Sequence, residues 1–91
     1  MTEGIKLFVA GEVEDKRSFA VDDGHMYCIT VVGRGFTHDQ YVTAEVYEAA
    51  PAKGELITLV GEAKVNKKGS VTIGMKSAQI AQQGKRSRMA A

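Results

Sequence analysis

Residues 55–80 of the chain read ELITLVGEAKVNKKGSVTIGMKSAQI, and this stretch decides the class of fold. Its first part, 55–65, is rich in branched apolar residues, and its last part, 70–80, begins by alternating apolar and polar residues, the spacing of a strand face. The polar segment between the two parts contains a glycine, which is typical of a β-hairpin loop. Gly61 and Gly74 interrupt the patterns where a small barrel needs a bulge or a tight bend. The stretch therefore predicts two antiparallel strands.

Three further strand patterns precede this hairpin, and they lie at residues 5–13, 25–32 and 40–47. The first leads into a charged stretch, 14–18, which we interpret as a loop, and Asp22-Asp23-Gly24 is a turn signal. Residues 48–54 form a connector, in which Pro51 limits any helix to a single turn.

The third pattern, 40–47, alternates cleanly between apolar and polar side chains. Its core-facing side chains would be Val42, Ala44 and Val46, and the outward ones Tyr41, Thr43, Glu45 and Tyr47. Five short strands without a convincing helix predict an all-β fold, and we interpret it as a five-stranded antiparallel OB-type barrel.

The length of 91 residues predicts one domain, which we place at residues 1–81. The polar, basic end at 82–91 is expected to be a disordered tail. No apolar run is long enough to span a bilayer, and the N-terminus does not resemble a signal peptide. The single cysteine, Cys28, rules out an intramolecular disulfide and suits a reducing compartment. We therefore expect a soluble cytoplasmic protein with no membrane partner.

Charge is distributed unevenly along the chain although the net charge is only +1. Residues 1–50 carry four basic and nine acidic side chains, whereas residues 51–91 carry eight basic and two acidic ones. Such asymmetry is typical of proteins that bind nucleic acid or another anionic surface. Folding can also bring the two halves of the chain together and even out the electrostatic field at the surface. Charge alone therefore leaves open whether the protein has an anion-binding surface or an evenly charged one.

The sequence contains no pattern that indicates catalysis, and we predict that the protein is not an enzyme. His25 and His38 are the only histidines, and their proximity to turn aspartates is a weak signal for a metal site. Cys28 lies in mid-strand, where an inert thiol is more common than a nucleophile. Gly33-Arg34-Gly35 lacks the other glycines and the helix of a dinucleotide-binding loop. We expect no catalytic residue, metal, cofactor or small-molecule substrate.

Binding of single-stranded nucleic acid has more support, because it needs aromatic faces for the bases and cations for the phosphates. The expected loops hold both kinds of side chain close together, namely Lys16, Arg17, Phe19, Arg34 and Phe36. The alternative is that the two loop phenylalanines pack onto the core.

Tyrosines and a group of lysines complete the set of candidate binding residues. Tyr41 and Tyr47 belong to the expected polar face of the third strand, whereas Tyr27 could lie on the surface or in the core. Phe8 is assigned to packing. The last hairpin carries the candidate phosphate-binding lysines Lys64, Lys67 and Lys68, which could equally protect a strand edge from aggregation.

Short motifs in the chain resemble the single-stranded DNA-binding proteins of filamentous bacteriophages, the gene V type helix-destabilising proteins. The motifs are Gly24-His25-Met26-Tyr27 opening the second strand, Gln40-Tyr41-Val42, Pro51-Ala52-Lys53-Gly54 before the fourth strand, and the hairpin Lys64 to Ser70. The likeness covers roughly residues 5–80.

This resemblance implies an OB-type fold, a two-fold dimer and cooperative coating of single strands without sequence preference. It also implies that Tyr27 stacks on bases, that Tyr41 is an exposed stacking residue, and that Lys16 and Arg17 are the basic residues of the first loop. A phage-encoded protein of this kind would act in DNA replication in the host cytoplasm.

The sequence thus supports two hypotheses from different classes. The first is a sequence-independent single-stranded DNA-binding homodimer that coats and protects strands during replication, with RNA as an open alternative ligand. The second is an OB-type protein–protein adaptor or replication accessory module, because exposed tyrosines and arginines suit both kinds of surface. The basic end of the chain, Lys85 to Ala91, argues against recruitment of partners through an acidic tail tip.

Overall fold

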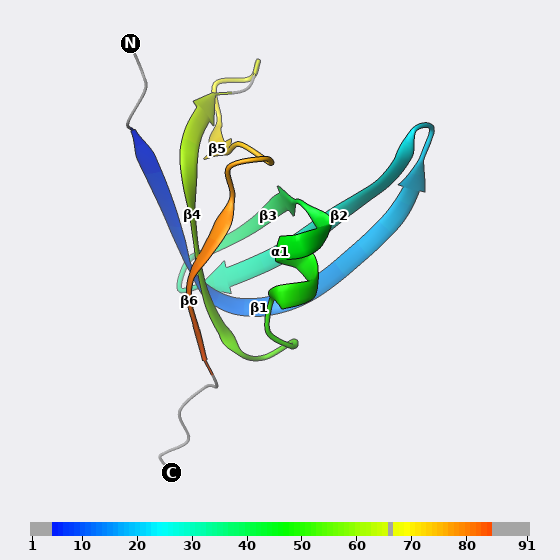
Figure 1. Ribbon diagram of the computed structural model, residues 1–91. Helices are drawn as coiled ribbons and strands as arrows, with labels where there is room; N and C mark the ends of the chain where they lie inside the picture. The colour runs from blue at the N-terminus through cyan, green and yellow to red at the C-terminus, as the bar shows by residue number, and fades with distance from the viewer. Residues whose placement is uncertain (1–4, 66, 85–91) are drawn as a thin grey trace.

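The backbone of the protein forms a curled antiparallel sheet with one short helix (Figure 1). The structure, a computed structural model, describes residues 5–65 and 67–84. The sheet has the strand order β3-β2-β1-β4-β5, and β6 also pairs with β4. The sheet curls into a half-barrel, so the expected all-β, OB-type fold is confirmed. In chain order the elements are β1 (Lys6–Val21), β2 (Gly24–Gly33), β3 (Phe36–Val42), α1 (Ala44–Ala49), β4 (Leu56–Val65), β5 (Val71–Ile73) and β6 (Gln79–Gly84).

The strand β1 runs for 16 residues and serves two different partners. Residues 6–12 pair with β4, and residues 12–21 pair with β2. The expected loop at 14–18 is therefore wrong, because these charged residues continue the ladder to β2 and alternate between its two faces. Gly11 allows the sheet to curl at the change of partner, since a Cβ there would collide with the Val32 carbonyl.

The ladder between β1 and β2 extends beyond the rest of the barrel as a hairpin, which we call the arm (residues 14–30). In Figure 1 the arm projects to the right, away from β4 and β6. Its end is the turn at Asp22 and Asp23, as the sequence predicted.

The third expected strand, 40–47, is displaced in the structure. β3 begins at Phe36 and ends at Val42, and residues 44–49 are helical rather than extended. Thr43 begins the helix, because its hydroxyl accepts a hydrogen bond from the Val46 backbone N–H at 3.4 Å. Apolar residues four apart fit a helix as well as a strand, which is why alternation misplaced this boundary.

The fifth expected strand, 70–80, is two strands separated by a turn. β5 ends at Ile73, the turn brings the Ser77 hydroxyl to the Glu62 backbone N–H at 2.9 Å, and β6 follows. β5 and β6 occupy the same edge of β4, one after the other. Residues 82–84 belong to β6, so the folded part passes the expected boundary at 81, and residues 85–91 of the expected tail lie outside the described residues.

The core lies inside the half-barrel and consists of the inward residues of alternating patterns. The fully buried apolar side chains include Val13, Ile29, Val31, Val42, Ile57, Leu59 and Ile73. Gly61 is part of this packing, because a Cβ there would collide with the Ile73 side chain. The sequence predicted a bulge or a tight bend at Gly61, whereas the residue pairs regularly with Leu7 of β1.

A single polar side chain, Gln40, closes the barrel between β3 and β5. Its amide nitrogen donates to the Ile73 carbonyl at 2.7 Å and to the Tyr41 carbonyl at 2.8 Å. Its oxygen accepts from the Ile73 backbone N–H at 3.4 Å and from the Thr72 hydroxyl at 3.2 Å. Among the described residues no backbone ladder joins β3 to β5, so the Gln40 amide takes the place of a peptide group at this seam.

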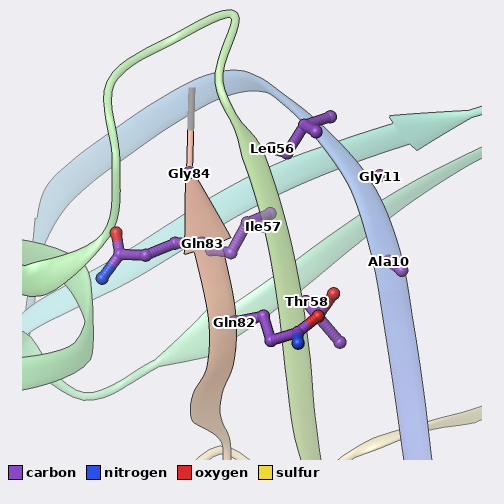
Figure 2. Close-up of a pocket in the computed structure, with 8 residues that line it drawn as sticks. All are labelled: Ala10, Gly11, Leu56, Ile57, Thr58, Gln82, Gln83 and Gly84. Atoms are coloured by element: carbon purple, nitrogen blue, oxygen red, sulfur yellow. The ribbon is translucent and has the colours of Figure 1, made fainter. Parts of the chain in front are cut away.

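Phe8 does not pack in the core, so its assignment to packing is wrong. It is 63% exposed on the outer side of β1, because the even-numbered residues of the part of β1 that pairs with β4, residues 6–12, point away from the barrel. A shallow pocket lies beside it on the same side of the sheet, bordered by Ala10 of β1, Thr58 of β4 and Gln82 of β6 (Figure 2).

Candidate nucleic-acid interface

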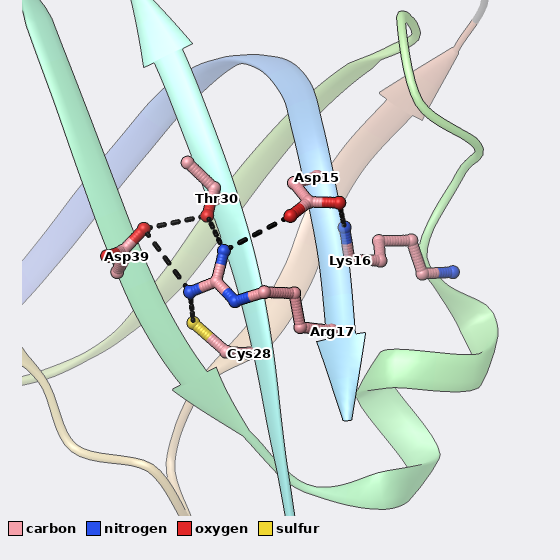
Figure 3. Close-up of polar contacts among 6 residues, drawn as sticks. All are labelled: Asp15, Lys16, Arg17, Cys28, Thr30 and Asp39. Atoms are coloured by element: carbon pink, nitrogen blue, oxygen red, sulfur yellow. Dashed lines mark hydrogen bonds and ion pairs between the residues drawn. The ribbon is translucent and has the colours of Figure 1, made fainter. Parts of the chain in front are cut away.

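The arm separates the candidate residues of the first half of the chain onto two opposite faces. Arg17 is paired with Cys28, and Cys28 is paired with Tyr41 on β3, so these three side chains share the outer face. Ser18 is paired with Tyr27, and Tyr27 with Val42, so Tyr27 lies on the inner face toward α1. Figure 3 shows Lys16 and Arg17 pointing to opposite sides of β1.

The outer face carries two exposed aromatic rings in contact. The ring centroids of Phe19 and Tyr41 are 6.5 Å apart in an edge-to-face arrangement, and both residues are 41% exposed. The rings come from strands that are not neighbours, β1 and β3, and meet across β2. Phe19 was expected in a loop, and its position on a strand gives it a defined direction.

Arg17 lies beside these rings in a network of polar contacts (Figure 3). One terminal nitrogen donates to the Thr30 hydroxyl at 2.9 Å and to an Asp15 carboxylate oxygen at 3.3 Å. The other donates to the Cys28 sulfur at 3.3 Å and lies 3.8 Å from an Asp39 oxygen. The Thr30 hydroxyl in turn donates to Asp39 at 2.7 Å. These contacts hold the guanidinium over β2.

The network shifts the titration of two groups. The hydrogen bond that Arg17 donates to Asp15, followed by smaller charge effects, raises the pKa of Arg17, which therefore stays charged. Burial raises the pKa of the Cys28 thiol, and the Arg17 guanidinium opposes part of that rise. A neutral, buried thiol agrees with the expectation that Cys28 is an inert packing residue.

The inner face of the arm holds a row of aromatic and basic side chains against the helix. The Lys16 ammonium donates to the Ala50 carbonyl at 3.1 Å, just after α1, and lies 4.9 Å above the Tyr47 ring. The Tyr47 and Tyr27 rings are 5.0 Å apart, and His25 stacks on Tyr27 at 5.7 Å.

Through these contacts, the side chains of Lys16, Tyr27 and Tyr47 hold α1 against the sheet. Tyr27 and Tyr47 are half-buried and pack against the core cluster. The expectation that Tyr47 faces outward from a strand is wrong, because the residue lies on α1. Base stacking by Tyr27 stays a prediction.

Arg34 and Phe36 lie at the turn between β2 and β3, at the end of the barrel away from the arm tip. Arg34 is exposed, and Phe36 is 42% exposed. The Phe36 ring covers the backbone of Gly33, since a Cβ at Gly33 would collide with it. The two residues are therefore separate from the Phe19–Tyr41 pair.

The candidate lysines of the last hairpin lie across the seam from β3. Lys64 is paired with Thr72, whose hydroxyl contacts Gln40. Lys67 and Lys68 are exposed at the hairpin turn. The β4–β5 hairpin therefore lies next to β3, on the edge of β3 that does not pair with β2.

Sequence reasoning missed the acidic partners of Arg17. Asp15 and Asp39 lie two residues before Arg17 and Tyr41, and residues two apart in a strand share a face. If residues 14–18 and 36–39 had been recognised as strands, the two-residue repeat of side-chain direction in a strand would have identified both acidic partners. A shallow groove over this network is lined also by Glu14 and Lys53, which gives it three carboxylates and two cations.

No protein-family model and no curated protein matches the chain. Among residues 5–65 and 67–84 there is no helix long and apolar enough to cross a membrane. In the same part of the chain no three histidine, cysteine or acidic side chains gather as a metal ion would require.

Proposed function

We propose that the protein binds single-stranded nucleic acid, without sequence preference, on the outer face of β1, β2 and β3. The observation that carries the proposal is the pair of exposed rings, Phe19 and Tyr41, in contact beside the Arg17 guanidinium. Single-strand binders combine aromatic stacking platforms with cations, and every base has a face on which a ring can stack.

The two rings suit this task because their direction is set by strands rather than by a mobile loop. Each base stacked on an aromatic ring contributes about 1–3 kcal/mol, whatever the base. Arg17 is held in place by Thr30 and two carboxylates, so little side-chain entropy is lost when it meets a phosphate or a base.

Phosphates of the same bound nucleic-acid strand would meet the lysines of the β4–β5 hairpin, which lies across the seam from β3. Lys64 and Lys67 are exposed on the β4–β5 hairpin, next to β3 through the contact between Thr72 and Gln40. OB-type domains commonly bind strands across β2 and β3, between the loops that flank them. A single strand of nucleic acid that crosses from the arm to the β4–β5 hairpin would pass from the Phe19 and Tyr41 rings to these lysines.

A second candidate, a protein–protein adaptor, is favoured by the charge around Arg17. The groove over the network holds three carboxylates and two cations, so it is not a basic surface. Exposed tyrosine, phenylalanine and arginine side chains are also enriched in protein interfaces.

Fluorescence anisotropy with two unrelated oligonucleotides of equal length tests the proposal. We expect similar affinities for both, weaker binding to duplex, and a steep fall in affinity as salt rises. Phe19→Leu and Tyr41→Leu should each weaken binding about 5- to 150-fold, the equivalent of 1–3 kcal/mol. Phe8→Leu is the matched control, because Phe8 is exposed on the part of β1 that pairs with β4, away from Phe19 and Tyr41. Absence of binding at low salt, or preference for duplex, would leave the adaptor as the better hypothesis.

A further inference from the structure

Two carboxylates border the exposed rings of the outer face on the side toward the barrel. Asp15 of β1 and Asp39 of β3 are both paired with Thr30 of β2, so the three residues form one line across the sheet. Since neighbouring strands are about 4.8 Å apart, the backbones at Asp15 and Asp39 are separated by roughly 10 Å. We call Asp15 and Asp39 the acidic row. Tyr41 lies two residues beyond Asp39 on the same face of β3, so the rings begin directly after the acidic row.

The other end of the ring surface is bordered by carboxylates as well. Phe19 lies beyond the acidic row along β1, toward the arm tip, where the turn holds the exposed residues Asp22 and Asp23. The Phe19 and Tyr41 rings therefore lie between acidic side chains at both ends, whereas the stacking rings of single-strand binders normally lie in a basic groove. The acidic row differs from the tip because it lies beside Arg17, the cation of this face (Figure 3).

Arg17 does not neutralise the acidic row. The guanidinium lies 3.3 Å from an Asp15 oxygen and 3.8 Å from an Asp39 oxygen, so one positive charge stands between two negative ones. Glu14 and Lys53 line the same groove, and their charges cancel. The Asp15 and Asp39 side chains are 50% and 56% exposed, so an approaching ligand can reach both carboxylates. A phosphate that approaches the acidic row therefore meets a net negative charge.

Single-stranded and duplex nucleic acids differ in what they offer to such a surface. A single strand is flexible, so it can turn its bases onto Phe19 and Tyr41 and direct its neighbouring phosphates away from the acidic row. A duplex offers no free base faces, because its bases are paired and stacked on one another. It also carries one phosphate charge per about 1.7 Å of its axis, twice the density of either of its strands. A duplex on this surface would gain no stacking and would bring phosphates over carboxylates.

We infer that Asp15 and Asp39 are specificity residues that exclude duplex nucleic acid from the outer face of the arm. They act by repulsion, since a binding site gains specificity from contacts that disfavour the wrong ligand as well as from contacts that favour the right one. This inference rests on the proposed function, in which the same face binds single strands. It assigns the weaker binding of duplex to two named carboxylates.

Asp39→Asn tests the inference with little change to the structure. The asparagine oxygen can still accept the hydrogen bond that the Thr30 hydroxyl donates at 2.7 Å, whereas the negative charge is removed. Fluorescence anisotropy at low salt with one labelled oligonucleotide, as a single strand and as its duplex, measures both affinities. We expect the affinity for duplex to rise at least about fivefold and the affinity for the single strand to change less than about twofold.

Glu48→Gln is the matched control, because it removes the same charge from an exposed position on α1, on the other side of the arm. It should leave the ratio of the two affinities unchanged. Asp15→Asn should act in the same direction as Asp39→Asn. The gain in duplex affinity should shrink as salt rises, because salt screens exposed charges. Circular dichroism checks that each variant is folded.

Several results would overturn the inference and leave the proposed function intact. One is an Asp39→Asn variant with the wild-type ratio of affinities, including duplex binding that stays undetectable; another is an equal change of the ratio in Glu48→Gln. A fall in single-strand affinity without a gain for duplex would mean that Asp39 only holds Arg17 in place. Absence of single-strand binding by the wild type at low salt is a different result, since it contradicts the proposed function and the inference together.

Discussion

Replacing Gln40 by leucine should separate β3 from β5, because the Gln40 amide is the bridge across that seam. Leucine is similar in size and suits a site that is 1% exposed, but it can neither donate nor accept a hydrogen bond. The substitution leaves the Ile73 carbonyl and N–H without their partner and removes a donor from the Tyr41 carbonyl.

The magnitude follows from counting these groups. Each buried polar group that loses its partner costs about 1–3 kcal/mol, and burying the apolar leucine side chain returns about 1 kcal/mol. We expect Gln40→Leu to lower the free energy of unfolding by about 2–4 kcal/mol, a large part of the 5–15 kcal/mol typical of a domain. This corresponds to a fall in Tm of roughly 10–25 °C for a domain of this size.

Urea denaturation followed by circular dichroism measures this loss. Gln83→Leu, the same change at an exposed position of β6, is the control and should alter stability by less than about 0.5 kcal/mol. A Gln40→Leu variant as stable as that control would refute the reasoning, since it would mean that the seam is held closed by other contacts.

Four shorter predictions concern other contacts in the protein. Tyr27→Leu should lower stability by about 1–3 kcal/mol through lost packing against α1, with nucleic-acid affinity unchanged; the reverse result would place Tyr27 in the interface. Arg17→Ala should weaken binding of all sequences alike and reduce the slope of log affinity against log salt by about one, as anisotropy at several salt concentrations would show. Burial raises the pKa of the Cys28 thiol in the folded protein, so folding favours the neutral thiol. The stabilisation that the neutral thiol provides is complete below the unfolded thiol pKa of about 8.5 and is lost as the pH rises toward the thiol pKa of the folded protein. Urea midpoints should therefore fall above pH of about 8.5 more for the wild type than for Cys28→Ala, and parallel curves would contradict this. Gly61→Ala should cost about 1–3 kcal/mol of unfolding free energy, because the added methyl collides with Ile73.

Alternation along the chain was sufficient to predict the class of fold and most of the core. Val31, Val42, Leu59 and Ile73 were all in strand patterns, and all are buried. Alternation failed at residues 43–49, where a capping threonine and helix-favouring residues form α1. It also failed at 14–18, where charged residues continue β1 because β2 supplies their hydrogen-bond partners.

The candidate site was predictable in its residue types and not in its arrangement. Proximity of an aromatic residue to cations identified Phe19 and Arg17, the polar face of the third strand pattern identified Tyr41, and the structure brings these three together. The sequence also grouped Lys16, as a neighbour of Phe19, and Tyr27, through the family resemblance, with them. The period of two along a strand places these two residues on the other face, but only once the strand boundaries are known.

What the sequence by itself determined is therefore local: which residues alternate, where the chain turns, and that a thin all-β core must result. What only the tertiary structure decided is which side of each strand is covered, because a period of two defines two faces without saying what packs on either. The tertiary structure turned Phe8 outward although it is as apolar as a core residue, and buried Gln40 although it is polar. The physical reason is closure of the barrel, which needs a hydrogen-bonding side chain where β3 and β5 do not form a ladder and leaves the outer side of β1 uncovered within one chain.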